Sequence, residues 1–210
     1  MRTLRSTRRV LRMESLDKRN LLTGDCAVAI EDGVLDITCD DDDNWVLVSG
    51  FNGAISVSSN QGTTFNGVAG PVLVTEAIDE VFLKGRRGDD ILQVNFLDVD
   101  TVRIGGGSGN DEIIAGVLNV EQLRINSGQG TDLVGVLDVT ASDRVVLKGR
   151  DDDDCISAFS LDVSGKLILD GGDGNDIGGV SNSTFGGLTL RSIETLDPSC
   201  GLGTAIATLN

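Results

Sequence analysis

The feature that most constrains this chain is a unit of 21 to 22 residues that recurs along it. Five copies begin at residues 81, 102, 123, 145 and 167, so that successive copies start 21, 21, 22 and 22 residues apart. Two copies contain the nearly identical hexapeptides GGSGND (106–111) and GGDGND (171–176). Regular spacing of this kind is typical of solenoids, in which each repeat stacks on its neighbours.

Within each copy, the apolar residues alternate as they do in β-strands. Val102 and Ile104 open one unit two positions apart, and Ile113 and Ala115 follow its Gly/Asp-rich turn. This period of two indicates strands with one buried face. A third short stretch with inward Leu and Val is expected after the second strand. It reads LDV or LNV and occurs at 97–99, 118–120, 137–139 and 161–163.

Three short strands per repeat predict an all-β fold, a right-handed parallel β-helix of about eight 21–22-residue rungs over residues 25–198. Weaker copies from residues 35, 55 and 188 complete the count, and the last of these keeps an aspartate at Asp197. We interpret residues 1–24 as a basic N-terminal targeting or disordered segment. Residues 199–210 are expected to form a C-terminal cap or tail.

The composition excludes several classes of function. The 210 residues carry a net charge of −16, which disfavours nucleic acid as a partner and favours cations. The chain has no histidine, so histidine-dependent nucleophilic catalysis and histidine-ligated zinc are excluded. No apolar stretch is long enough to predict a transmembrane segment.

The spacing of the cysteines does not decide whether they form disulfides. Cys26, Cys39, Cys155 and Cys200 are widely spread and form no C-x-x-C pair. This spacing does not indicate a zinc or redox motif. The four residues could form two disulfides in an oxidising compartment, or could remain as free thiols.

One position of the turn places an acidic side chain in every well-preserved repeat. Stacked strands lie about 4.8 Å apart, so these carboxylates should repel one another unless cations, protons or water relieve the repulsion. Bound cations are one interpretation, and aspartates that only hydrogen-bond their own turns are the other. The column consists of Asp90, Asp111, Asp132, Asp154 and Asp176.

The segments GGSGNDEII and GGDGNDIGG resemble the glycine-rich nonapeptide of the RTX, or haemolysin-type, calcium-binding repeats. This resemblance implies that glycine carbonyls and aspartate carboxylates of neighbouring turns bind Ca²⁺. The matching residues are Gly106, Gly107, Gly109 and Asp111 in one rung and Gly171, Gly172, Gly174 and Asp176 in another. The acidic column and the run DDDD at 151–154 add Asp90, Asp132, Asp152 and Asp154 as candidate metal ligands.

A second resemblance concerns the N-terminal segment. The stretch LDKRNLL at 16–22 resembles the Leu-Glu-x-Arg-x-Leu-Leu motif of exported planctomycete surface proteins, with Asp17 in place of the glutamate. Leu16, Arg19, Leu21 and Leu22 match the motif. The resemblance implies an extracellular or cell-surface location, although the segment lacks the apolar run of a secretory signal peptide.

These features together predict a non-catalytic structural or adhesive solenoid with calcium-binding turns. Cell-surface or matrix components are the expected macromolecular partners. A metal-independent structural solenoid is one alternative. A polysaccharide-active β-helix enzyme is another, because basic residues lie beside the turns, where they could also form salt bridges. These residues are Lys84, Arg86, Arg87, Lys148 and Arg150.

Overall fold

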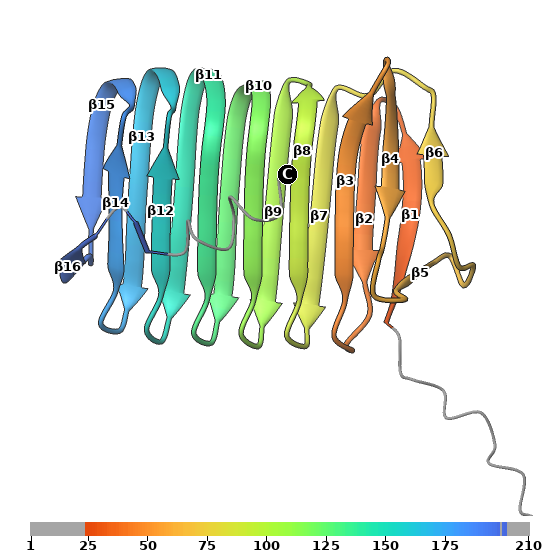
Figure 1. Ribbon diagram of the computed structural model, residues 1–210, viewed down its shortest axis with the longest axis horizontal. Coiled ribbons are helices and arrows are strands. Elements are labelled where there is room, and N and C mark those ends of the chain that lie inside the picture. The colour runs from red at the N-terminus through yellow and green to blue at the C-terminus, as the bar shows by residue number, and fades with distance from the viewer. Residues whose placement is uncertain (1–23, 198, 201–210) are drawn as a thin grey trace, which may run out of the picture.

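The chain folds into a parallel β-solenoid of about five turns, each formed by about 22 residues. The computed structural model describes residues 24–197 and 199–200, and Figure 1 shows successive repeats lying side by side along the long axis. The all-β solenoid fold is therefore confirmed. The N-terminal motif at 16–22 and most of the expected C-terminal cap lie outside the described residues.

Strands of successive turns pair in parallel to form two sheets that face each other across the core. In the first sheet are β2 (Val34–Cys39), β7 (Glu80–Arg87), β9 (Thr101–Ser108), the C-terminal parts of β10 (Glu112–Gln129) and β11 (Leu133–Asp151), β13 (Asp162–Asp173) and β15 (Thr184–Arg191). In the second sheet are β3 (Trp45–Phe51), β8 (Ile91–Asp98), the N-terminal parts of β10 and β11, β12 (Cys155–Phe159), β14 (Ile177–Ser181) and β16 (Thr195–Leu196).

The alternation of the sequence predicts the core correctly. Val102, Ile104, Ile113 and Ala115 are all at most 2 % exposed and point between the two sheets. Residues two apart on a strand share a face, so each repeat adds one layer of aliphatic side chains to a continuous core. The core is built from Val, Leu and Ile because the chain has few aromatic residues.

A sharp bend links the second sheet to the first in each turn. The residue at the bend has a positive φ in five successive turns, namely Phe96, Val117, Asp138, Ser160 and Asn182. The third stretch follows this bend, and the register pairs Leu118 with Leu97 and with Val139. The expected alignment of LDV at 137–139 is therefore wrong by two residues, because Leu137 precedes the bend, and although it is buried it does not belong to the core cluster.

The N-terminal end differs from the expected eight rungs because two β-hairpins replace parallel rungs there. β1 (Asp25–Glu31) pairs antiparallel with β2 through Asp32–Gly33, and β4 (Ala54–Ser58) pairs antiparallel with β3 through Asn52–Gly53. All four turn residues have positive φ, as two-residue hairpin turns require. The repeat expected from residue 55 is therefore wrong, whereas those from 35 and 188 join the parallel stack.

Two further short strands complete this end of the solenoid. β6 (Val72–Val74) pairs antiparallel with β4, and β5 (Thr64–Phe65) pairs with β1. Phe65 is 1 % exposed and joins the core cluster. The N-terminal layer of the core is thereby covered.

Two disulfides resolve the question that the cysteine spacing left open. Cys26–Cys39 joins β1 to β2, and Cys155–Cys200 ties the residues after β16 to β12. Disulfides persist in oxidising compartments, so these two bonds suggest a location outside the reducing cytoplasm. The described residues contain no helix long and apolar enough to cross a membrane.

Removal of the Cys26–Cys39 bond should destabilise the N-terminal hairpin end. The bond closes a loop with a sequence separation of 13 residues, and its loss should lower the free energy of unfolding by about 3 kcal/mol. We expect the double variant Cys26→Ala/Cys39→Ala to unfold at lower urea concentration than the oxidised wild type. Equal midpoints under oxidising conditions would contradict a stabilising role.

Candidate functional site

The acidic column of the turns is buried and forms a hydrogen-bonded ladder between rungs. Each member is at most 2 % exposed. The backbone N–H of Asp90 donates to Oδ1 of Asp111 at 2.9 Å, and that of Asp111 donates to Oδ1 of Asp132 at 2.8 Å. The same bond joins Asp132 to Asp154 at 2.9 Å and Asp154 to Asp176 at 2.8 Å. Each carboxylate thus satisfies a backbone donor of the preceding rung.

Different residues occupy the column at its two ends. Asn44 pairs in register with Asp90 and donates its backbone N–H to Oδ1 of Asp90 at 2.8 Å. At the other end, Asp176 donates to Oε2 of Glu194 at 2.8 Å. Glu194 aligns with Asp176 only 18 residues later, so the expected assignment of Asp197 to this column is wrong. The shorter final rung is the reason that a fixed spacing missed Glu194.

The second carboxylate oxygen of each aspartate is buried without a hydrogen-bond partner. This holds for Oδ2 of Asp90, Asp111, Asp132, Asp154 and Asp176. The pKa of Asp90, Asp111 and Asp154 is raised to about 7, mainly because burial removes their hydration; the backbone N–H donors oppose this increase and neighbouring carboxylates add to it. Burial also raises the pKa of Asp132 and Asp176. The interior therefore favours protonated carboxyl groups.

The first glycine of the hexapeptide makes room for this carboxylate. A Cβ atom on Gly106 would lie 2.2 Å from Oδ2 of Asp111 and 2.4 Å from the backbone oxygen of Ser127. The same overlap, at 2.2 Å, would arise between Gly171 and Asp176. A proton on Oδ2 would make this oxygen a hydrogen-bond donor, and the backbone oxygen of Ser127 borders the same space.

The other two glycines are required by the backbone conformation. Gly107 and Gly109 have φ values of 129° and 128°, and Gly172 and Gly174 have values of 114° and 151°. Residues with side chains rarely adopt this conformation. All four defining positions of the hexapeptide therefore have a structural role in the turn, without reference to an ion.

A second ladder runs along the outside of the turns in the opposite direction. Asn110 donates its backbone N–H to Oδ1 of Asp89 in the preceding rung at 2.7 Å, and Thr131 donates to Oδ1 of Asn110 at 2.9 Å. Asn175 donates likewise to Asp153 at 2.8 Å. Each of these turns is consequently held to one neighbour by its buried aspartate and to the other by its exposed residue.

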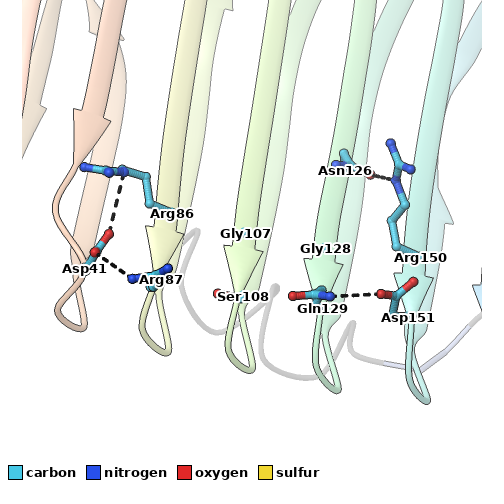
Figure 2. A pocket seen from close by; sticks show the side chains of 10 residues that line it. All are labelled: Asp41, Arg86, Arg87, Gly107, Ser108, Asn126, Gly128, Gln129, Arg150 and Asp151. Atoms are coloured by element: carbon cyan, nitrogen blue, oxygen red, sulfur yellow. Dashed lines mark hydrogen bonds and ion pairs between the residues drawn. The ribbon is translucent and has the colours of Figure 1, made fainter.

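The basic residues beside the turns point away from the buried column. Lys84 forms an ion pair with Asp36 at 2.8 Å, and Arg87 pairs with Asp41 at 3.2 Å. Figure 2 shows Arg86 and Arg87 approaching Asp41, whereas Arg150 bonds to Asn126 on the other side of Gly107 and Gly128. Salt bridges thus form at the surface, and they do not neutralise the buried aspartates.

The geometry of the column fits a calcium ion poorly. Calcium takes about six to eight oxygen ligands, whereas each turn offers one unpartnered carboxylate oxygen packed against a glycine. Within residues 24–197 and 199–200, no three acidic or cysteine side chains are grouped to hold a metal ion. Asp152 is exposed and does not join the column, since it has φ 76° at the third glycine position. Calcium binding at these turns stays a prediction, which a calcium titration would test.

Substitution of Asp111 tests whether the buried aspartates stabilise the fold by joining rungs or are only acidic residues of a turn. Asp111→Ala removes the acceptor for the buried N–H of Asp90 and should lower the free energy of unfolding by about 3 kcal/mol. Asp111→Asn should cost much less, because the amide oxygen keeps the acceptor, as Asn44 already does in the same column. Urea unfolding at pH 7 measures both. As a control, Asp89→Ala changes an exposed carboxylate, and an equal loss there would contradict the special role of the buried column.

The raised pKa values predict that acid stabilises the fold. Between about pH 3.8 and pH 7, the folded protein keeps protons on these carboxyl groups. The unfolded chain has already lost them, because its aspartates have an ordinary pKa of 3.8. This contribution is complete below about pH 3.8 and disappears as the pH rises through about 7. We expect Tm to be higher at pH 5 than at pH 8 by about 5 °C or more. The double variant Asp111→Asn/Asp154→Asn should show a weaker dependence of Tm on pH. A wild-type Tm that increases from pH 5 to pH 8 would contradict the prediction.

Comparisons with protein-family models, curated proteins and solved structures gave no match to this chain. The structure thus assigns a β-solenoid with a stacked ladder of buried aspartates and identifies no family.

Proposed function

We propose that this protein is a non-catalytic structural solenoid that works outside the cytoplasm, at the cell surface or in the extracellular matrix. The uninterrupted ladder from Asn44 to Glu194 carries this proposal. Carboxyl groups are unfavourable to bury, and the hydrogen bonds of these buried side chains join one rung to the next. The two disulfides support the location, and the absence of histidine disfavours histidine-dependent catalysis. We further propose right-handed winding, the usual hand of crossovers between parallel strands.

Cell fractionation tests the proposed location. Antibody detection in the cells that make the protein should find it in extracytoplasmic fractions, with all four cysteines resistant to thiol alkylation unless a reductant is added. Recovery of the protein from the cytoplasm with reactive thiols would overturn the proposed location. The fold itself would be unaffected by that result.

Calcium binding at the turns is a second candidate, and one observation favours it. The unpartnered Oδ2 atoms form a file of buried oxygens, and a file of ionised carboxylates would attract cations. Protons and calcium ions would relieve the same repulsion, so the two candidates differ in their dependence on pH. A protonated ladder needs no ion below about pH 7, whereas an ionised ladder at higher pH would gain from one.

Thermal unfolding with calcium or with a chelator separates the two candidates. At pH 5, we expect the same Tm in both, within about 1 °C, because protons already neutralise the ladder. If calcium binds the turns, it should raise Tm at pH 8 by about 5 °C or more, and Asp111→Asn should reduce this gain. Equal Tm values at pH 8 would overturn calcium binding and leave the structural role in place.

A further inference from the structure

All ten lysines and arginines of the described chain lie on the first sheet. They are distributed over β7, β9, β10, β11, β13 and β15, and the strand segments of the second sheet carry none. These residues are Lys84, Arg86, Arg87, Arg103, Arg124, Arg144, Lys148, Arg150, Lys166 and Arg191. In a chain of net charge −16, this segregation concentrates the positive charge of the described residues on one face.

Seven of these residues surround a hollow in the centre of the sheet, which we call the basic basin. Its rim consists of Lys84, Arg86, Arg87, Arg103, Arg124, Lys148 and Arg150, and its floor of Gly105, Gly107, Asn126 and Gly128. The register sets Arg86, Gly107, Gly128 and Arg150 in one row across four strands. A parallel row contains Lys84, Gly105, Asn126 and Lys148. In these two rows the smaller residues of the two middle strands lie between basic residues of the outer two, whereas Arg103 and Arg124 pair with each other on the middle strands.

The basin is large enough for a small oligomer. It comprises two adjoining hollows of about 540 Å³ and 560 Å³ that share Asn126 and Arg150. Three strand spacings of about 4.8 Å separate its two basic walls by about 14 Å. No acidic side chain lines the larger hollow, and Asp41 and Asp151 border the smaller one.

Three of the seven rim residues, all arginines, have no carboxylate partner among the described residues. Lys84 and Lys148 form ion pairs with Asp36 and Asp170 on neighbouring strands, and Arg86 and Arg87 pair with Asp41 in the turn between β2 and β3. By contrast, Arg103 stacks on the ring of Phe82 at 4.8 Å, Arg124 bonds to Oε1 of Gln122 at 3.2 Å, and Arg150 bonds to Asn126. These neutral contacts orient the guanidinium groups and leave their charge uncompensated by an adjacent acid.

Two of the rim arginines are held in a conformation that the repeat otherwise gives to glycine. Arg86 and Arg150 have φ values of 87° and 110°, and the equivalent positions in the intervening and following rungs are Gly107, Gly128 and Gly172. A residue with a side chain is disfavoured at such φ values. The conformation of the turn therefore does not explain why arginine occurs at these two positions. The arginine side chain is what distinguishes these two rungs from the rungs with glycine.

We propose that the basic basin binds an acidic oligosaccharide, with the rim arginines contacting its carboxylate or sulfate groups. Guanidinium groups recognise such anions through paired hydrogen bonds. Asn126, Ser108 and Gln129 offer neutral donors and acceptors for hydroxyl groups along the same hollows. This inference deepens the structural role proposed above, because it names the kind of surface polymer that the solenoid would hold.

The remaining surface favours a saccharide over a nucleic acid. A long phosphate backbone would extend beyond the basin towards acidic residues such as Asp36, Asp41 and Asp170, which border its basic walls. Phe82 is the one aromatic side chain that lines the larger hollow, and Arg103 already covers its ring. Stacking of several bases, on which binding of single strands depends, has no platform here.

Fluorescence anisotropy with a labelled hexamer of galacturonate tests the proposal. We expect the full chain to bind this probe, more weakly as salt increases, and not to bind an uncharged glucose hexamer. The variant Arg86→Gly/Arg150→Gly restores the glycine of the other rungs, so its Tm should be unchanged or higher. Its affinity for the acidic hexamer should nevertheless fall about 10-fold or more.

The matched control removes the same number of charges from the same sheet outside the basin. Arg144→Ala/Lys166→Ala should bind the hexamer within about 2-fold of the wild type, because exposed distant charges contribute little. Equal losses in the two double variants, or tighter binding of a 20-nucleotide single-stranded DNA, would overturn the proposal. Absence of binding to the acidic hexamer at low salt would also overturn it. A lower Tm in Arg86→Gly/Arg150→Gly would also count against the proposal, because it would show that the turn itself requires these arginines.

Discussion

The structure depends on how buried backbone N–H groups of the turns are satisfied. Backbone oxygens of neighbouring rungs accept some of these donors, but the N–H group of each aspartate in the column donates to a side-chain acceptor. Aspartate supplies it from the next rung, at the cost of burying a carboxyl group whose second oxygen has no partner. Protonation makes this arrangement favourable, because a neutral carboxyl group is far cheaper to bury than a carboxylate.

This constraint links the glycines, the aspartates and the arginines of the turn in one account. Gly106 is small so that Asp111 can turn inward, and Gly107 and Gly109 give the chain the conformation that aims it there. Arg86 and Arg150 replace glycine where the ladder does not require a side chain. The inside of the turn is thus specialised for stacking, whereas its outer face is free to carry charge for another purpose.

Much of this fold could be predicted from the sequence, and the failures have identifiable causes. The period of 21 to 22 residues and the alternation of apolar residues predict the parallel stack and its core. The hairpins at Asp32–Gly33 and Asn52–Gly53 were missed, although both pairs are strong turn signals. Spacing alone also could not predict that Asp111 is buried, since an acidic residue in a turn is usually solvated. The basic basin was hidden because its residues are brought together only by register across four strands.

The two ladders have a direction, and this has a consequence for the length of the protein. Every internal turn donates to the next rung from its buried aspartate and, where the outer ladder is present, to the preceding rung from its exposed residue. Duplication or deletion of one internal repeat would therefore leave the buried contacts of its neighbours chemically unchanged. Asn44 and Glu194 mark the two ends of the ladder and do not fix the number of rungs between them, so an evolving gene could lengthen or shorten the rod in whole units.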